Sequence, residues 1–299
     1  TVDVAAVWQR PSKLVIPVAP PALDCSGCHQ RARMRLGLCK RRDARREAPH
    51  FASPRGGPEG REAFDHGADL VYHSATKFLS GHGTVIGGLV VDGGSFDWDA
   101  SGRFPELCQP YDGFHNMVFS EESTVGAFLL RARREGLRDF GACMSPHTAW
   151  LILQGIETLP LRMARHVENT RKVVAFLAGQ AMVARVGYPE LEGHPSHELA
   201  QRLLPRGCGS VFSFDLKGSR KQGQAFIEAL KIFSHLANVG DCRSLVIHPA
   251  STTHFRMDDA ALAAAGITAG TIRLSIGLED ADDLIDDLKR AFKLAQKAG

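Results

Sequence analysis

Short apolar runs alternate with longer segments of helical period from about residue 66 to the end of the chain. The runs are rich in Val, Ile, Leu and Phe and are bounded by Gly, Pro, Asp or Ser, which is typical of buried strands. Strands are predicted at residues 68–73, 83–92, 182–186, 210–216, 244–248 and 271–276. Strands that alternate with helices favour an α/β fold, in which helices pack on sheets.

Four segments have the spacing of a helix with one apolar face. In the last of them, Leu284, Leu288, Ala291 and Ala295 recur every three or four residues. Acidic residues occupy its first turn and a lysine lies near its end, which matches the helix dipole. Helices are predicted at residues 123–139, 146–178, 219–232 and 281–298, and Pro160 is expected to kink the second.

Composition divides the chain into three parts. Residues 1–60 form a leader without a clear helical or strand period, and its stretch 31–46 holds eight Lys or Arg against one Asp. The leader is either a basic arm for nucleic acid or a disordered or non-native segment, and the second interpretation is favoured. Residues 61–178 are predicted to belong to a large domain and residues 179–299 to a small C-terminal α/β domain, because long helices give way to shorter units near residue 178.

The net charge and the cysteine content indicate in which compartment the protein works and which classes of partner are disfavoured. The net charge is +3 over 299 residues, too small to favour a nucleic acid or a membrane surface as partner. Seven cysteines at irregular spacings fit a reducing compartment better than a disulfide framework. No apolar run approaches the length of a membrane span, and the first residues do not resemble an export signal. We therefore expect a cytoplasmic protein that binds neither nucleic acid nor a membrane.

The segment HSATKFLSGHG, residues 73–83, places one lysine where an apolar run meets a glycine-rich turn. A buried ammonium is costly unless it is paired or loses its proton, so Lys77 either extends to solvent or is reactive. Ser74 and Thr76 supply hydroxyls beside it, and the turn supplies open backbone suited to an anion. A phosphorylated aldehyde held beside an amine is the arrangement needed for a Schiff base with pyridoxal phosphate. Taken alone, however, two hydroxyls at a strand end are more often ordinary turn groups.

Four stretches carry a resemblance to a known family, and they cover about residues 62–299 in order. They are HSATKFLSGHGTVIGGLVVDGGSFDW, REGLRDFGACMSPHTAWLILQGIETLPLRMARHVENT, NVGDCRSLVIHPASTTH and GTIRLSIGLEDADDLIDDL. They resemble the Cys/Met-metabolism (trans-sulfuration) enzymes that depend on pyridoxal 5'-phosphate, and most of all the O-acetylhomoserine sulfhydrylases. The resemblance implies the aminotransferase-like fold type I, with an incomplete large domain and a small C-terminal domain. It also implies a homo-oligomer, a tetramer if complete, that acts in methionine biosynthesis.

The resemblance implies a γ-replacement, in which sulfide or a small thiol displaces acetate from O-acetylhomoserine to give homocysteine or a related amino acid. It implies that Lys77 binds the cofactor and moves protons, and that Ser74 and Thr76 hold the cofactor phosphate. Arg273 matches the family's arginine for the substrate α-carboxylate, a bidentate task that suits a guanidinium. Ser244 lies where the family supports the same carboxylate. Without the family, Arg273 would be interpreted as a solvated strand residue. No metal is expected.

The sequence departs from the family at its N-terminal side. A large part of the family's N-terminal region has no counterpart, and the position of its ring-nitrogen aspartate falls on Ala48. Loss of that carboxylate would weaken the cofactor as an electron sink. This departure leaves a truncated and inactive homologue as one alternative. A cystathionine γ-synthase or γ-lyase type of activity is another, because the matching motifs do not separate these close relatives.

Two further patterns are weighed and set aside. CSGCH, residues 25–29, has the form of a covalent haem site, and with Cys39 it could also hold zinc, but chance explains so short a pattern better. His73, His82, His248 and His254 are candidate acid–base groups by type, yet packing and turn hydrogen bonds are the commoner role of such residues.

Overall fold

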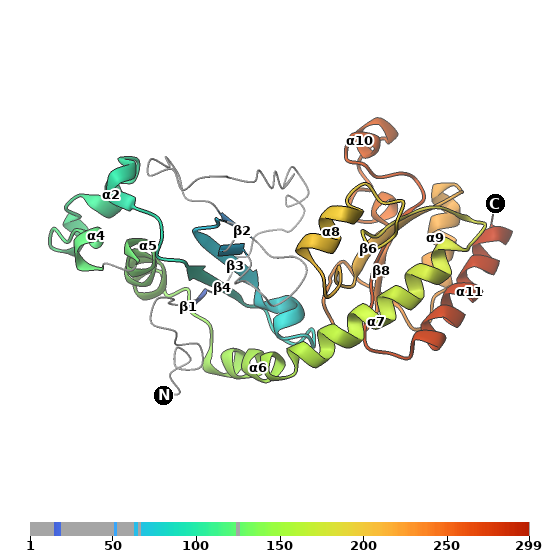
Figure 1. The fold of residues 1–299 in the computed structure, drawn as a ribbon, viewed down its shortest axis with the longest axis horizontal. Helices are drawn as coiled ribbons and strands as arrows, with labels where there is room; N and C mark the ends of the chain where they lie inside the picture. The colour runs from blue at the N-terminus through green and yellow to red at the C-terminus, as the bar shows by residue number, and fades with distance from the viewer. Residues whose placement is uncertain (1–14, 19–50, 53–62, 65–66, 124–125, 299) are drawn as a thin grey trace. The chain divides into compact units, whose positions relative to one another are not determined.

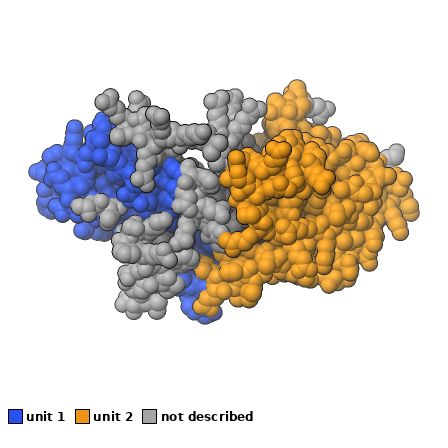
Figure 2. Space-filling model, in the orientation of Figure 1, with its two compact units in different colours: residues 1–24, 31–80, 84–154 blue, residues 25–30, 81–83, 155–299 orange. Residues whose placement is uncertain are grey.

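The computed structural model describes residues 15–18, 51–52, 63–64, 67–123 and 126–298. The chain forms two compact units (Figure 2). Unit 1 comprises residues 1–24, 31–80 and 84–154, and unit 2 comprises residues 25–30, 81–83 and 155–299. Among the described residues, no helix has the length and apolar character needed to cross a bilayer. The leader assigned to residues 1–60 lies almost wholly outside the described residues, apart from two short strands.

Unit 1 is built on a four-stranded sheet with the order β1-β4-β3-β2 (Figure 1). The strands are β1 (Val15–Val18), β2 (Phe51–Ala52), β3 (Leu70–Ser74) and β4 (Gly88–Asp92). β4 runs antiparallel to both β1 and β3, whereas β2 and β3 are parallel. The β3–β4 register pairs Leu70 with Asp92 and Ser74 with Gly88, so the loop between these strands contains residues 75–87.

The other described elements of unit 1 are short helices and turns. They are η3 (Ala75–Leu79), α2 (Trp98–Ser101), α3 (Pro105–Cys108), η4 (Asp112–Phe114), α4 (Phe119–Glu122), α5 (Ala127–Arg131), η5 (Ala132–Asp139) and most of α6 (Pro146–Glu157). An aromatic cluster packs several of them together. The Trp98 ring makes an edge contact with Phe96 at 4.8 Å and stacks on Phe128 at 6.0 Å, measured between ring centroids. Such pairs add to the stabilisation from burial.

Unit 2 contains a five-stranded sheet with the order β5-β6-β9-β8-β7, antiparallel except for β7 and β8. Its strands are β5 (Val183–Gly187), β6 (Val211–Leu216), β7 (Ser234–His235), β8 (Leu245–Ile247) and β9 (Thr271–Ser275). Its helices are α7 (Leu159–Ala178), α8 (His197–Leu203), α9 (Arg220–Ala229), η6 (Pro249–Ser251), α10 (Asp259–Ala264) and α11 (Ala281–Lys297).

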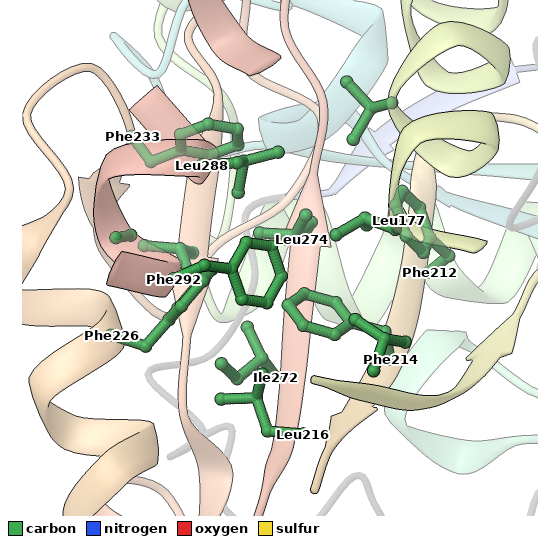
Figure 3. Packing of buried hydrophobic residues seen from close by; sticks show 14 of the residues in the cluster. Leu177, Phe212, Phe214, Leu216, Phe226, Phe233, Ile272, Leu274, Leu288 and Phe292 are labelled. Atoms are coloured by element: carbon green, nitrogen blue, oxygen red, sulfur yellow. The ribbon is translucent and has the colours of Figure 1, made fainter. Parts of the chain in front are cut away.

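The core of unit 2 lies between its sheet and the helices α7, α9 and α11 (Figures 1 and 3). Every second residue of a strand faces the same side, so Ile272 and Leu274 of β9 point toward this core and are fully buried. The apolar stripe of α11 meets them through Leu288 and Phe292. The Phe226 ring of α9 contacts that of Phe292 at 4.9 Å. Burial of each large side chain contributes about 1.5–3 kcal/mol, so this core is a main source of stability.

The division between the two compact units falls within α6, between residues 154 and 155, and the domains expected at residues 61–178 and 179–299 stay a prediction. The physical reason is that Val173, Val174 and Leu177 of α7 are buried in the core of unit 2. The expected kink is confirmed. α6 ends at Glu157 and α7 begins at Leu159, so that Pro160 lies in the first turn, where its missing N–H leaves no helical bond unmade.

Candidate functional site

Lys77 lies on a wide turn, η3, that leads out of strand β3. The Ser80 N–H donates to the Ala75 carbonyl at 3.1 Å, five residues back, and the Ser80 hydroxyl donates to the Thr76 carbonyl at 3.3 Å. The backbone at Lys77 itself departs from helical values, with φ −90° and ψ −130°, and the residue is half-buried. The amine is therefore attached to a backbone of defined conformation.

Thr76 fastens this turn to the entrance of strand β4. Its N–H donates to the Gly87 carbonyl at 3.2 Å, and its hydroxyl accepts from the Gly87 N–H at 3.0 Å. The hydroxyl also approaches the Gly87 carbonyl at 3.3 Å. A side chain at Gly87 would lie 2.9 Å from both Ile152 and Met144, so the close approach needs glycine. The Thr76 hydroxyl is thus a bracing group in this structure, and its longer bond to Gly87 is the one that a bound anion could replace.

Ser74 completes the group of sequence-predicted residues in unit 1. It is exposed at the end of β3, and its hydroxyl makes no capping hydrogen bond to the turn that follows. A primary amine with an exposed hydroxyl three residues before it and a second hydroxyl adjacent to it fits a phosphorylated aldehyde in its donor chemistry. These side chains could hold a phosphorylated aldehyde such as pyridoxal phosphate, which Lys77 would bind through its amine.

Arg273 lies on β9 of unit 2, on the opposite face of the sheet from Ile272 and Leu274. It is half-buried, and its Nη2 donates to the Asn238 carbonyl at 3.3 Å. Within the described part of the chain no carboxylate pairs with it. Burial lowers the pKa of Arg273, yet a guanidinium remains charged at neutral pH. A charged, partly desolvated arginine without an anionic partner is suited to bind a substrate carboxylate.

Ser244 precedes β8, the strand that pairs with β9, and it is fully buried. Its hydroxyl donates to Glu279 at 2.9 Å and accepts from the Gly277 N–H at 2.8 Å. Its own N–H donates to the other oxygen of Glu279 at 2.6 Å. Both hydrogen-bonding roles of this hydroxyl are therefore used inside unit 2. The structure thus groups Lys77, Ser74 and Thr76 in unit 1 and gives Arg273 and Ser244 to unit 2.

The histidines considered in the sequence occupy different environments. His248 is fully buried, with Nδ1 2.8 Å from the Ser251 hydroxyl and Nε2 2.8 Å from the Ala269 carbonyl. Burial lowers the pKa of His248, and a hydrogen bond to Ala269 opposes that shift. Burial also lowers the pKa of His73 on β3. His248 therefore has the packing and turn role that was expected.

The sequence pattern did not single out three buried polar residues of α7, namely Arg162, His166 and Asn169. The helical spacing of these residues was a usable signal, because they lie on the same helix face as the apolar residues that enter the core. Ala48 and the segment CSGCH lie outside the described residues, and the described part of the chain holds no cluster of His, Cys, Asp and Glu suited to a metal.

A hollow of about 270 Å³ in unit 1 is lined by residues 94–99, 120, 123 and 126–127. Lys77 does not line it. The candidate site therefore rests on the amine, the hydroxyls and the bracing hydrogen bonds of the lysine turn, and not on this hollow.

Comparison with known sequences agrees with the chemistry of the lysine turn. A sequence model of the Cys/Met metabolism PLP-dependent enzymes, where PLP is pyridoxal phosphate, matches residues 56–293. Homocysteine synthase of Schizosaccharomyces pombe is 47% identical over 232 residues, which cover 77% of this chain and 54% of the relative. O-acetyl-L-homoserine sulfhydrylase 1 of Thermus thermophilus is 48% identical over 226 residues, which cover 76% of this chain and 53% of the relative. The chain thus spans about half the length of the curated relatives it matches.

Two solved structures agree in fold. A Campylobacter jejuni protein assigned as an O-acetylhomoserine (thiol)-lyase, which carries a pyridoxyl-lysine monophosphate residue, is 37% identical with a TM-score of 0.71. That match covers 77% of this chain and 55% of the neighbour. Cystathionine gamma synthase of Xanthomonas oryzae, in complex with cystathionine, is 36% identical with a TM-score of 0.61 and covers 79% of this chain and 52% of the neighbour. The predicted α/β fold of type I is confirmed, and the chain belongs to the Cys/Met metabolism PLP-dependent enzyme family.

Proposed function

We propose that this chain uses pyridoxal phosphate to carry out γ-replacement on O-acetylhomoserine, with sulfide or a small thiol as the incoming group. The wide turn that carries Lys77 directly after Thr76 and three residues after Ser74 is the observation that carries the proposal. Membership of the family and relatives named homocysteine synthase and O-acetyl-L-homoserine sulfhydrylase support it. In the overall reaction the Cγ–O bond to acetate breaks and a Cγ–S bond forms, giving homocysteine when the thiol is sulfide.

The chain's residues bind the reactants and move protons. When bound, the cofactor supplies an electron sink for charge that develops at the substrate Cα. Lys77 holds the cofactor through its amine and, once substrate replaces it, accepts the Cα proton. Ser74 and Thr76 hold the phosphate, the latter by exchanging its weak bond to the Gly87 carbonyl for one to the anion. The hydrogen bonds between Thr76 and Gly87 keep the Lys77 amine within reach of the substrate Cα, whose proton it accepts.

Unit 2 supplies the proposed carboxylate site. Arg273 binds the substrate α-carboxylate, for which its unpaired and partly desolvated charge is suited. Ser244 supports that site indirectly, because its O–H already donates to Glu279 and a carboxylate needs a donor. Ser244 therefore fixes the backbone beside β9. We further infer that the protein acts in the cytoplasm, where free thiols persist, and as a homo-oligomer.

The first experiment tests the lysine. Purified protein is mixed with pyridoxal phosphate, reduced with borohydride and digested, and we expect mass spectrometry to find the cofactor on the peptide that contains Lys77. Lys77→Arg keeps the positive charge but cannot form the Schiff base, so it should lose the label. Lys217→Arg, which changes an exposed surface lysine, is the matched control. A folded wild-type protein without label at Lys77 would contradict the proposal.

The second experiment tests the reaction. O-acetylhomoserine and sulfide are added to the loaded protein, and the release of acetate and the formation of homocysteine are measured together. Equal amounts of both products are expected from γ-replacement. Cofactor on Lys77 without any turnover would instead favour a truncated and inactive homologue.

A second candidate function is condensation with cysteine. The structural likeness to cystathionine gamma synthase, at a TM-score of 0.61, is the observation that favours it. Cysteine offered in place of sulfide would then give cystathionine at the higher kcat/KM, whereas release of acetate without any thiol would indicate γ-elimination.

A further inference from the structure

Three buried polar side chains follow one face of α7. Arg162, His166 and Asn169 lie at positions i, i+4 and i+7, so they leave the helix from one stripe. Arg162 is 6% exposed and the other two are fully buried. Burying a polar group is costly unless it is hydrogen-bonded. The hydrogen-bond partners of these three side chains therefore show which segments α7 holds in place.

Arg162 packs on the loop that follows Lys77. Its Nη2 donates to the Gly155 carbonyl at 2.6 Å and its Nε donates to the Thr158 hydroxyl at 3.2 Å, which fixes the guanidinium. The fixed guanidinium lies against Gly81, where a side chain would overlap it. Gly81 also has φ +73°, which disfavours any residue except glycine. The loop is therefore fitted to Arg162.

The same loop is held from a second segment of unit 2. The Cys242 N–H donates to the Gly81 carbonyl at 2.7 Å. Gly83 lies against the Asp241 carboxylate, which is buried and pairs with Arg243 at 3.4 Å. The backbone at Gly81 is thus fixed on two sides, only four residues after Lys77.

Asn169 holds the turn that follows strand β9. Its Nδ2 donates to the carbonyls of Gly277, at 3.1 Å, and Glu279, at 2.8 Å. The Glu279 carboxylate in turn accepts from the N–H and the hydroxyl of Ser244. This turn begins directly after the strand that carries Arg273. Asn169 therefore holds the turn that follows the strand of Arg273, as Arg162 holds the loop that follows Lys77.

His166 lies between these two residues on the stripe. Its Nδ1 is 2.6 Å from the Ile276 carbonyl, so Nδ1 carries the proton and donates. The Thr170 hydroxyl donates to the His166 carbonyl at 2.7 Å, which completes a polar face along two turns of α7.

We propose that this face of α7 positions two segments of unit 2, the loop that follows Lys77 and the turn that follows β9. Arg162 sets the backbone that leads out of Lys77, and Asn169 sets the end of the strand that carries Arg273. The proposal rests on the proposed function, because that function assigns the amine and the carboxylate-binding group. Arg162 and Asn169 act through other residues and are positioning residues, and their effects separate. Arg162 governs the chemistry of the lysine, and Asn169 governs the binding of the carboxylate.

The variants Arg162→Lys and Asn169→Ser test this separation in the full chain. Lysine keeps the charge but lacks the fork that reaches both Gly155 and Thr158, and serine cannot span both carbonyls. Arg165→Lys and Glu168→Gln are matched controls on the exposed face of the same helix, where these two side chains pair at 3.6 Å. Gly81→Ala disturbs the Arg162 contact from the loop side and provides a second, independent route to the same effect.

Three measurements are made on each variant. Amide hydrogen exchange of the cofactor-free protein is followed in peptides that contain residues 81–83 and 276–279. The rate at which borohydride fixes pyridoxal phosphate on Lys77 is measured by mass spectrometry. The affinity of the loaded protein for homoserine, which lacks the acetate leaving group, is measured from the cofactor absorbance.

Arg162→Lys and Gly81→Ala should speed exchange at residues 81–83 and slow labelling of Lys77 about 10-fold, with homoserine affinity unchanged. Asn169→Ser should speed exchange at residues 276–279 and weaken homoserine binding about 10-fold, with labelling unchanged. Variants that shift both properties together, or neither, would overturn the proposal, because a merely structural role loosens the unit as a whole. Wild-type protein that takes up no pyridoxal phosphate would overturn the proposed function as well, and that outcome is distinct from selective failure in the variants.

Discussion

At Gly223, close packing is expected to reverse the usual stabilising effect of replacing a helical glycine by alanine. Gly223 lies inside α9, where replacement by alanine ordinarily stabilises a helix by about 1 kcal/mol. Here an added Cβ would lie 2.5 Å from Nε2 of His248, whose ring is fixed by Ser251 and Ala269. Gly223→Ala should therefore lower the free energy of unfolding by about 1–3 kcal/mol, the usual cost of overpacking, in urea denaturation.

The matched control is Gly136→Ala in η5, where nothing lies within 4 Å of the added Cβ. It should leave stability unchanged or raise it by up to about 1 kcal/mol. A stabilised Gly223→Ala protein would show that the His248 ring moves freely, against its two hydrogen-bonded contacts.

The buried imidazoles predict a loss of stability in weak acid. Burial lowers the pKa of His166 and of His248 in the folded protein, whereas the unfolded chain titrates near 6.5. Above pH 6.5 neither state binds the proton, so stability does not depend on these groups. As the pH falls below 6.5 the unfolded state takes up protons that the folded state does not, so each histidine can cost up to about 1.4 kcal/mol per pH unit.

Urea midpoints measured between pH 7.5 and 5.5 test this expectation. The carboxyl of Glu190, whose pKa lies below its usual range, adds its own loss only at lower pH. The variant His248→Gln should show a shallower fall than wild type over the same window. A midpoint that stays constant to pH 5.5 would mean that the folded protein takes up these protons without cost.

At the scale of single residues, the sequence revealed groups that chemistry makes conspicuous. Lys77 was conspicuous because burying an ammonium among apolar residues is costly unless the group is paired or reactive. Arg273 was found through the family resemblance. The Ser244 hydroxyl was a candidate substrate contact, but its partner Glu279 lies 35 residues away in sequence, a pairing that no local pattern reveals. Arg162 and Asn169 were missed because a polar residue on an apolar stripe resembles a simple interruption of the pattern.

At the scale of elements, α9 offers a test of local sequence signals. Ser219 caps the helix: its hydroxyl accepts from the Gln222 N–H, and its own N–H donates to the Gln222 side chain at 2.9 Å. Ser219→Ala should lower the free energy of unfolding by about 1 kcal/mol, the usual value of an N-cap. Ser219→Asp keeps the acceptor and suits the helix dipole, so thermal unfolding should show it close to wild type. An Asp variant as unstable as the Ala variant would mean that the side-chain acceptor at residue 219 is not what stabilises the helix.

The longer elements could be predicted because their periodicity is set by burial. The predicted strand at 271–276 corresponds to β9 (Thr271–Ser275), and the predicted helix at 281–298 to α11 (Ala281–Lys297). The segment 123–139 was predicted as one helix, but the structure describes α5 followed by η5, in which the backbone bonds span five residues. Four-residue helices such as α2 were missed, because one turn is too short to show a period.

At the scale of the whole molecule, the residues named in the proposed function are distributed over both units of the chain. Unit 1 supplies Lys77, Ser74 and Thr76, and unit 2 supplies Arg273 and the positioning face of α7. The loop 81–83 belongs to unit 2 although Lys77 lies only a few residues before it. Only a few residues of chain thus separate Lys77 from the unit that contains Arg273. Long-range contacts place the loop 81–83 in that unit, and no local sequence pattern could show them.

Cofactor binding should therefore stabilise the folded chain as a whole. A ligand that binds only the folded state adds about 2.7 kcal/mol when its concentration is 100 times its Kd. Pyridoxal phosphate should raise the Tm of the wild-type protein more than pyridoxamine phosphate does, because the latter keeps the phosphate and ring but has no aldehyde for Lys77. In Lys77→Ala the two compounds should give equal shifts, which would report the noncovalent contacts of the phosphate and the ring. Equal shifts in the wild-type protein would instead show that Lys77 makes no covalent bond, and the lysine would then be a bracing residue of the β3–β4 loop.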